Sequence, residues 1–327
     1  ADLKQLYTNY TSTFGGIMLW DASWYSNNQA YVSSLASWVR ANMKCGAAVA
    51  PAPISMLSAS AAPINDLNKR IIGGYLLGSH GAPYAVKIAI DMGNNEILSC
   101  GGSILTKNHI LTAAHCVVND AGTGVLKPSQ FTIGYGDSLI KNQKTVQGTK
   151  VFMHPGFKQQ KVNANDLAII QVPDISLDGK SARAISIFTG SIDEGQMLVA
   201  MGWGTTKTDN DPDSLSDELK AALVHVGDKK SCQKFDPQYQ SSNGNKVCAL
   251  NKFSPGNSTC KGDSGSAVVI KGPGGYYLAG LVSQGGRKVN SNCGTPDGYS
   301  LFTRISSHLD FIASVTGADN STLTKSY

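Results

Sequence analysis

The chain has 327 residues, with 41% apolar and 16% charged residues, which is typical of globular protein and more than one ordinary domain requires. The 28 basic residues exceed the 23 acidic ones only slightly, and they form no long basic run. No apolar stretch is long enough to span a bilayer, so composition argues against nucleic-acid binding and against a membrane role. We therefore expect two unequal globular parts.

The first 45 residues differ in character from the rest of the chain. The segment Thr13–Ser23 reads as a buried strand with a polar end, and Gln29–Met43 carries apolar residues at helical spacing. This pair resembles the last β/α unit of a family 18 chitinase barrel, and Trp20 matches the tryptophan at the floor of that family's sugar site. The family's acidic catalytic motif is absent, so we expect residues 1–45 to be a chitinase-barrel-like remnant that cannot hydrolyse chitin. An ordinary amphipathic prosegment is the alternative.

Residues 46–70 read as a linker. From Gly46 to Pro63 the composition changes to Ala, Pro and Ser, and few of these side chains could build a core. The dibasic pair Lys69-Arg70 then stands directly before Ile71-Ile72-Gly73-Gly74. The chain as given begins at Ala1 without a methionine or signal peptide, so we expect a fragment or a processed form.

Beyond Ile71 the sequence shows short apolar runs broken by Gly, Asn, Asp and Pro, which is an all-β pattern. One helix is predicted near the end, over Ser306–Val315, because apolar residues there share a helical face. The predicted strands are Ala85–Ile90, Ser103–Leu111, Phe131–Gly134, Leu167–Val172, Met197–Met201, Ala267–Ile270 and Leu278–Ser283.

Three short motifs carry the candidate chemistry. Ser264 lies in Cys260-Lys261-Gly262-Asp263-Ser264-Gly265-Ser266, where glycines allow the backbone to approach a substrate closely. A serine hydroxyl is a weak nucleophile unless a base removes its proton and a third group holds that base in one tautomer. His115, after an apolar run, and Asp166, before another, could supply these groups.

The order His115, Asp166, Ser264 resembles the chymotrypsin-like serine peptidases of the trypsin superfamily. Further matching motifs stand in that family's order: Ile71-Ile72-Gly73-Gly74, Cys100-Gly101-Gly102-Ser103, Gly202-Trp203-Gly204 and Ser283-Gln284-Gly285. The resemblance covers residues 71–316 and leaves residues 317–327 as a tail. It implies two six-stranded antiparallel barrels, a C-terminal helix, and a catalytic triad in the cleft between the barrels.

The resemblance also implies the roles of the catalytic residues. Ser264 is the expected nucleophile, His115 the base, and Asp166 the group that orients and stabilises the imidazole. The backbone amides of Gly262 and Ser264 are the expected oxyanion hole, and Ser283 is the expected support of the aspartate. The family's second glycine after the nucleophile is replaced by Ser266, which we expect to do little damage. No cofactor and no metal site are expected.

The cysteines follow the family's pairing. The expected disulfides are Cys100 with Cys116, Cys232 with Cys248, and Cys260 with Cys293. Cys45 is left over, either free or paired with another chain. Because disulfides persist in oxidising compartments, we expect a secreted, extracellular protein.

The Lys69-Arg70 junction is interpreted as an activation site. In the family, cleavage before the isoleucine frees an amine that pairs with the acid preceding the nucleophile, so cleavage after Arg70 would allow the amine of Ile71 to pair with Asp263. We therefore expect a zymogen whose partners are an activating protease and protein or peptide substrates. A solvated dibasic loop is the alternative.

Specificity depends on the pocket below the cleft, to which we assign Ser258, Ser283, Gly285 and Ser300. The resemblance places Ser258 on its floor and Gly285 on one wall. Anchoring the alignment on Phe302-Thr303-Arg304-Ile305 places Ser300 on the other wall, and we prefer it because it leaves no gap before the helix. The neutral pocket then predicts cleavage after aromatic or large aliphatic residues. Anchoring on Pro296 places Asp297 there instead, which would favour cleavage after Lys or Arg. Gln284 replaces the family's tryptophan beside the next subsite.

The sequence therefore predicts a secreted, monomeric serine endopeptidase made as a zymogen. Two other functions remain open. A non-catalytic binding protein built on a peptidase fold usually lacks a triad residue, and a chitinase–peptidase fusion product would need barrel residues that this chain lacks.

Overall fold

In the computed structural model, the described residues are 74–93, 95–119, 124–159, 163–206, 214–254, 256–287 and 293–325. All of them belong to one compact unit, Asp66–Tyr327. The expected chitinase-like remnant with Trp20, the linker, Cys45, Arg70 and Ile71 lie outside the described residues.

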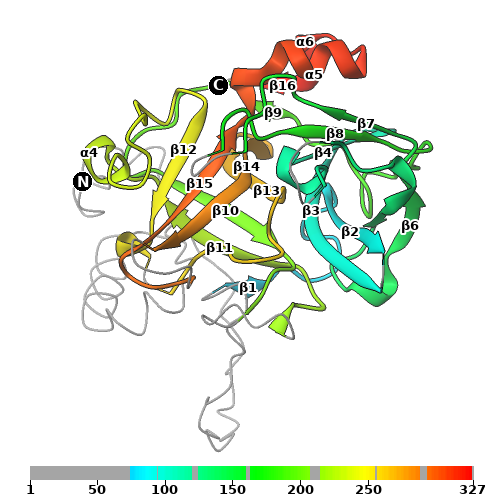
Figure 1. The fold of residues 1–327 in the computed structure, drawn as a ribbon, viewed down its shortest axis with the longest axis horizontal. Helices are drawn as coiled ribbons and strands as arrows, with labels where there is room; N and C mark the ends of the chain where they lie inside the picture. The colour runs from blue at the N-terminus through cyan, green and yellow to red at the C-terminus, as the bar shows by residue number, and fades with distance from the viewer. Residues whose placement is uncertain are drawn as a thin grey trace, which may run out of the picture. The chain divides into compact units, whose positions relative to one another are not determined.

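The first sheet has seven antiparallel strands in the order β6-β5-β2-β3-β4-β8-β7 and lies on the right of Figure 1. Burial alternates along β2, so the apolar Val86, Ile88 and Ile90 face the interior of this sheet while Lys87 and Ala89 face away from it. The strands are β2 (Ala85–Gly93), β3 (Glu96–Thr106), β4 (His109–Thr112), β5 (Phe131–Tyr135), β6 (Lys144–Gln147), β7 (Lys150–Met153) and β8 (Ala168–Gln171).

β6 and β7 follow one another across a short interruption, and together they close this sheet into a barrel. β6 pairs with β5, β7 pairs with β8, and only Gly148 and Thr149 separate them. The ladder continues across the interruption, because Gly148 N donates to Phe131 O and Thr149 N donates to Gln171 O. A Cβ atom at Gly148 would lie 2.7 Å from Pro128 O, so only glycine fits there. β6 and β7 therefore act as one kinked strand, and the barrel has six strands in effect.

The second sheet has nine strands, of which β11-β10-β13-β14-β15-β12 form the central path. A bridge between Val226 and Ala249 joins its two ends and closes a second six-stranded barrel. β1 and the parallel pair β9 and β16 add to it at the edges. The strands are β1 (Tyr75–Leu76), β9 (Ile187–Phe188), β10 (Met197–Gly202), β11 (Lys220–His225), β12 (Lys246–Leu250), β13 (Ala267–Gly272), β14 (Gly275–Arg287), β15 (Gly298–Arg304) and β16 (Thr324–Lys325).

Short helices connect the strands and finish the chain. α5 ends at Gly317, whose φ of +67° is the left-handed conformation that commonly terminates helices. None of the helices in the described ranges has both the length and the apolar character needed to cross a bilayer. The helices are η1 (Ala114–Cys116), η2 (Pro128–Gln130), η3 (Ile140–Asn142), α4 (Lys229–Cys232), η5 (Asn251–Phe253), η6 (Ile305–His308), α5 (Leu309–Thr316) and α6 (Asn320–Leu323).

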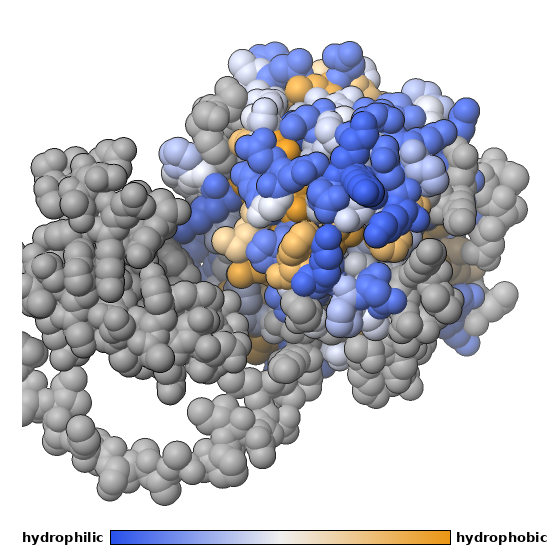
Figure 2. All heavy atoms as spheres, turned by 90° about the vertical axis from the view of Figure 1, so that its left-hand side faces the viewer, coloured by the Kyte–Doolittle hydropathy of each residue, from blue (hydrophilic) through white to orange (hydrophobic). Residues whose placement is uncertain are grey.

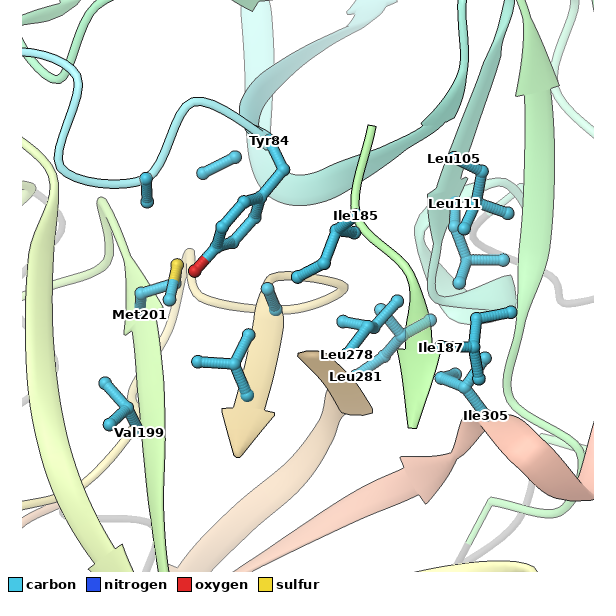
Figure 3. Close-up of a cluster of buried hydrophobic side chains, with 14 of the residues drawn as sticks. Tyr84, Leu105, Leu111, Ile185, Ile187, Val199, Met201, Leu278, Leu281 and Ile305 are labelled. Carbon is cyan, nitrogen blue, oxygen red and sulfur yellow. The ribbon is translucent and has the colours of Figure 1, made fainter. Parts of the chain in front are cut away.

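One cluster of buried side chains draws on both barrels, as Figure 3 shows. Strands β3 and β4 of the first barrel and β10 and β14 of the second contribute to it, and Ile305 joins from η6. Its labelled members are Tyr84, Leu105, Leu111, Ile185, Ile187, Val199, Met201, Leu278, Leu281 and Ile305. Burial of this apolar surface fixes the two barrels against each other, which is what holds residues from both in one site.

The predicted all-β class with two barrels and a closing helix is confirmed, and η6 followed by α5 replaces the single helix expected over Ser306–Val315. The single strand predicted over Ser103–Leu111 is wrong, because a turn at Lys107 and Asn108 divides it between β3 and β4. Beyond α5, the segment expected to be a tail contains α6 and β16, which pairs with β9.

The described surface near α4 and β12 is mostly hydrophilic with small hydrophobic areas (Figure 2).

Candidate active site

The pairing of β4 with β8 brings His115 and Asp166 together. Thr112 at the end of β4 lies opposite Ala168 at the start of β8. His115 follows β4 in η1, and Asp166 precedes β8 by two residues. His115 Nδ1 lies 2.8 Å from Asp166 Oδ2, and His115 N donates to Asp166 Oδ1 at 2.9 Å. Two bonds from one residue fix the imidazole relative to the carboxylate.

Asp166 is 1% exposed and receives further hydrogen bonds from two other side chains. Ser283 Oγ donates to its Oδ2 at 2.5 Å, and Asn163 Nδ2 donates to the same oxygen at 3.3 Å. Burial by itself raises the pKa of Asp166, but the charge of His115 and the hydrogen bonds from His115 and Ser283 outweigh it and lower that pKa. The carboxylate therefore stays ionised beside the imidazole at neutral pH.

A β-bulge in β14 directs Ser283 toward Asp166. Opposite β15, Val282 pairs with Phe302 and Gln284 pairs with Leu301, so Ser283 is an extra residue in the ladder. Thr303 of β15 supports the same aspartate from its backbone side, because its Oγ1 donates to Asp166 O at 2.9 Å. The second barrel thus holds a residue that belongs to the first.

Ser264 lies in the loop that leads into β13, and two contacts place this loop beside the segment that carries His115. Gly101 N donates to Ser264 O at 2.7 Å. Gly265, with φ of +75°, packs so closely that a Cβ atom there would lie 2.2 Å from Thr112 Oγ1 and 2.8 Å from Ala113 N. Only glycine fits in this position. The loop therefore sits directly against the residues that precede His115.

Asp263 is fully buried, and it directly precedes the half-buried Ser264. Its Oδ1 accepts a hydrogen bond from Gly204 N at 2.7 Å, and its Oδ2 accepts one from Cys260 N at 2.8 Å. A Cβ atom at Gly202 would lie 2.2 Å from the same carboxylate. Burial raises the pKa of Asp263 to about 7, against the opposing effect of these hydrogen bonds.

This raised pKa predicts a pH effect on stability. The folded chain binds a proton at Asp263 up to about pH 7, whereas the unfolded carboxyl releases it near pH 3.9, as roughly expected of a free aspartate. The uncut chain should therefore lose stability as pH rises between these values, by at most about 1.4 kcal/mol per pH unit from this group. Urea unfolding of the chain and of Asp263→Asn at pH 5 and 8 measures the difference. An equal pH dependence in both proteins would contradict the assignment.

Ser266 replaces a glycine of the resembled family, and it is accommodated by Gly101. The Ser266 side chain is buried, and a Cβ atom at Gly101 would lie 1.9 Å from its Oγ and 2.9 Å from its Cβ. The Ser266 side chain thus occupies the space that a side chain at position 101 of β3 would need. Its backbone N donates to Asp263 O, so the turn around Ser264 is kept.

The expected pocket residues also come together. Gly285 lies directly opposite Ser300 in the β14–β15 pairing, and a Cβ atom at Gly285 would lie 3.6 Å from Ser300 Oγ. Ser300 Oγ is 3.1 Å from Thr259 Oγ1, and Ser258 Oγ donates to Thr259 O. Ser258 and Ser300 are each 1% exposed. Asp297, by contrast, is exposed and precedes β15.

The three expected disulfides are present: Cys100–Cys116, Cys232–Cys248 and Cys260–Cys293. The last one fixes the loop of Ser264 to the segment before β15. Sequence reasoning missed Asn163 and Thr303 as partners of Asp166. Thr303 belongs to the segment used to anchor the alignment, and Asn163 stands three residues before the aspartate. No sequence pattern marked either residue as a hydrogen-bond partner of Asp166.

Comparisons with known proteins agree with this geometry. A family model described as Trypsin matches residues 71–312. Human Kallikrein-8 is 29% identical over 255 residues, which cover 76% of this chain and 87% of that protein. The Proclotting enzyme of Tachypleus tridentatus is 27% identical over 76% of this chain and 67% of its own length. Human Serine protease 1 is 25% identical over 80% of this chain and 96% of its own length.

Proposed function

The chain belongs to the trypsin family of chymotrypsin-like serine proteases, which are hydrolases of class EC 3.4.21, and we propose that it is a secreted endopeptidase made as a zymogen. The observation that carries the proposal is the hydrogen-bonded group of His115, Asp166 and Ser283, packed against the loop of Ser264. The test is removal of the Ser264 hydroxyl, which should abolish turnover.

In the proposed reaction, His115 acts through its Nε2 atom because Nδ1 faces Asp166. Ser264 Oγ forms a bond to the scissile carbonyl carbon while its proton passes to Nε2. The same proton then passes to the leaving amine as the C–N bond breaks, and a water molecule repeats the sequence on the acyl-enzyme. Asp166 keeps the imidazole in one tautomer and stabilises its charged form.

The backbone amides of Gly262 and Ser264 are the proposed oxyanion hole. Gly262 has φ of +88°, a conformation that favours glycine, and hydrogen bonds on either side of it hold the turn. Negative charge develops on the carbonyl oxygen only as the tetrahedral intermediate forms, so donors aimed at that position accelerate the chemical step. Each such donor contributes a factor of about 10²–10³ in rate.

For specificity, we propose a neutral pocket formed by Ser258, Gly285 and Ser300. The pairing of Gly285 with Ser300 supports the alignment that places Ser300 on the wall, and Asp297 is exposed at the end of its loop. A buried cation would have no fixed negative charge to pair with, which is strongly unfavourable. Cleavage should therefore follow aromatic or large aliphatic residues.

A panel of chromogenic peptides that differ only before the cut tests this pocket. Peptides with Phe, Tyr, Leu or Met should be cleaved with kcat/KM roughly 10²-fold higher than those with Lys or Arg. Ser258→Asp should shift the preference toward Lys and Arg, because it adds a charge at the proposed floor. Preference of the parent protein for Lys or Arg, lost in Asp297→Asn, would show instead that Asp297 lines the pocket.

We propose the remaining properties on the following support. Three disulfides favour an oxidising compartment and hence secretion. The burial of Asp263 favours a cationic partner, which cleavage after Arg70 would create as the amine of Ile71. The Ala, Pro and Ser composition of Gly46–Pro63 supports a linker and activation segment over residues 46–70, with a separate chitinase-barrel-like part over residues 1–45. The expected partners are protein or peptide substrates and an activating protease, and the expected state is a monomer.

A further inference from the structure

Lys87 is a half-buried lysine on the outer face of β2. Its neighbours Val86 and Ile88 point into the first barrel, so Lys87 points the other way. The ammonium group donates a hydrogen bond to Ser99 Oγ on β3. Long charged side chains usually extend into solvent, so a lysine fixed between the barrels needs an explanation.

The strand register places Lys87 on the face that carries the loop of Ser264. Lys87 lies opposite Gly101, and Ala89 lies opposite Ser99, so all four residues share one face of β2 and β3. Gly101 on this face donates its N–H to Ser264 O. Lys87 and Ser99 are thus part of the surface on which the nucleophile loop rests.

Ser99 forms one wall around Gly262. A Cβ atom at Gly262 would lie 2.8 Å from Leu215 Cδ2, 3.1 Å from Gly204 Cα and 3.6 Å from Ser99 Oγ. Leu215, Gly204 and Ser99 therefore bound the space beside the Gly262 Cα atom, and the Ser99 hydroxyl faces this space from β3. A change in the Ser99 side chain would therefore alter the surroundings of the Gly262 backbone.

The charge of Lys87 also acts on this loop. Lys87 lowers the pKa of Asp263, opposing the larger effect of burial. Burial lowers the pKa of Lys87 itself to about 8, while Asp263 and the exposed Asp217 act to raise it. Lys87 is therefore mainly charged at neutral pH, and its field favours the ionised form of Asp263.

We infer that Lys87 is a positioning residue for the oxyanion hole: by holding the Ser99 hydroxyl toward Gly262 and placing a positive charge behind the loop, it fixes the Gly262 amide for the developing oxyanion. This inference rests on the proposed function. Its effect falls on the transition state, because the amide meets negative charge only when the tetrahedral species forms. Substrate binding in the ground state does not depend on it.

The experiment compares Lys87→Met, Lys87→Arg and Ser99→Ala in the processed protein, with a peptide amide substrate. Lys87→Met should lower kcat by about tenfold with KM unchanged, less than the 10²–10³-fold loss from removing an oxyanion donor. A peptide boronic acid, which forms a tetrahedral adduct, should bind about tenfold more weakly, whereas a matched unreactive peptide should bind equally well. Lys87→Arg should keep most of the activity because it retains the charge and a donor.

Controls separate positioning from general destabilisation. Lys107→Met removes an exposed lysine that pairs with Asp174 and should leave all these constants unchanged. Ser99→Ala should lower kcat less than Lys87→Met, and the double variant should lose less than the product of the two, because both act through one contact.

The outcomes are distinguishable. Lys87→Met with unchanged kcat and boronate affinity, or with equal weakening of the boronate and the unreactive peptide, would overturn the inference alone. If Lys87→Met fails to fold, Lys87→Arg together with Ser99→Ala decides by the same two inhibitors. A processed parent protein without turnover would contradict the proposed function instead.

Discussion

Replacing Ser264 with alanine should lower kcat for peptide hydrolysis by about 10⁶-fold, because removal of one triad member disables the whole group. Labelling by an organophosphate should be lost as well, since this reagent reacts with the activated serine oxygen. The disulfides and the unfolding temperature should remain those of the parent, because Ser264 is held through its backbone bond to Gly101.

Ser314→Ala is the matched control, since it removes an exposed hydroxyl on α5 that donates only to Phe311 O. It should hydrolyse peptides and react with the organophosphate like the parent. Retention of peptide hydrolysis in Ser264→Ala would show that another residue is the nucleophile and would sink the assignment. Measuring labelling and turnover on the same preparations excludes a contaminating protease.

The second large effect concerns activation, which Arg70→Gln should prevent. The buried carboxylate of Asp263 has backbone donors in Gly204 and Cys260, but in the uncut chain no amine of residue 71 exists to neutralise it. Loss of one partner of a buried ion pair costs about 3–5 kcal/mol, which is on the order of 10²–10⁴-fold in the balance between inactive and active arrangements. The Arg70→Gln protein should fold with the same disulfides and stay inactive after treatment with a trypsin-like processing enzyme.

Asp263→Asn separates cleavage from its consequence. The variant should be cut after Arg70 as readily as the parent, which gel analysis and N-terminal sequencing can show, yet remain about 10²-fold less active. Its amide cannot form the ion pair that the new amine requires. If uncut Arg70→Gln hydrolysed peptides as fast as the processed parent, the zymogen mechanism would be wrong.

The local sequence predicted those parts of the site that depend on short motifs. The Ser264 loop, His115 beside Cys116, and Asp166 before an apolar run each have a recognisable pattern, and the structure brings His115, Asp166 and Ser283 into one hydrogen-bonded group. Lys87 could not be found in this way. A lysine in an alternating strand predicts only a solvent-facing side chain, and its burial comes from the packing of a second barrel far along the chain.

Strands with a strong local sequence pattern were predicted, and strands that depend on tertiary pairing were not. Strands with continuous apolar runs, such as β8 and β10, were predicted near their observed positions. β11 and β12 were missed, because each contains an apolar run of only four residues after a lysine, and so short a run does not distinguish a strand from other buried structure. Their pairing with β10 and β15 supplies the stability that local propensity does not.

The contact between Ser266 and Gly101 limits the order in which this sequence could have changed. A residue larger than glycine at position 101 would collide with both the Cβ and the Oγ atom of Ser266. Glycine at position 101 must therefore have been present before, or acquired together with, the serine at position 266. The two positions are 165 residues apart in the chain (266 − 101), and yet the residue tolerated at one depends on the residue present at the other. Across related sequences, substitutions at the two sites should consequently be correlated rather than independent.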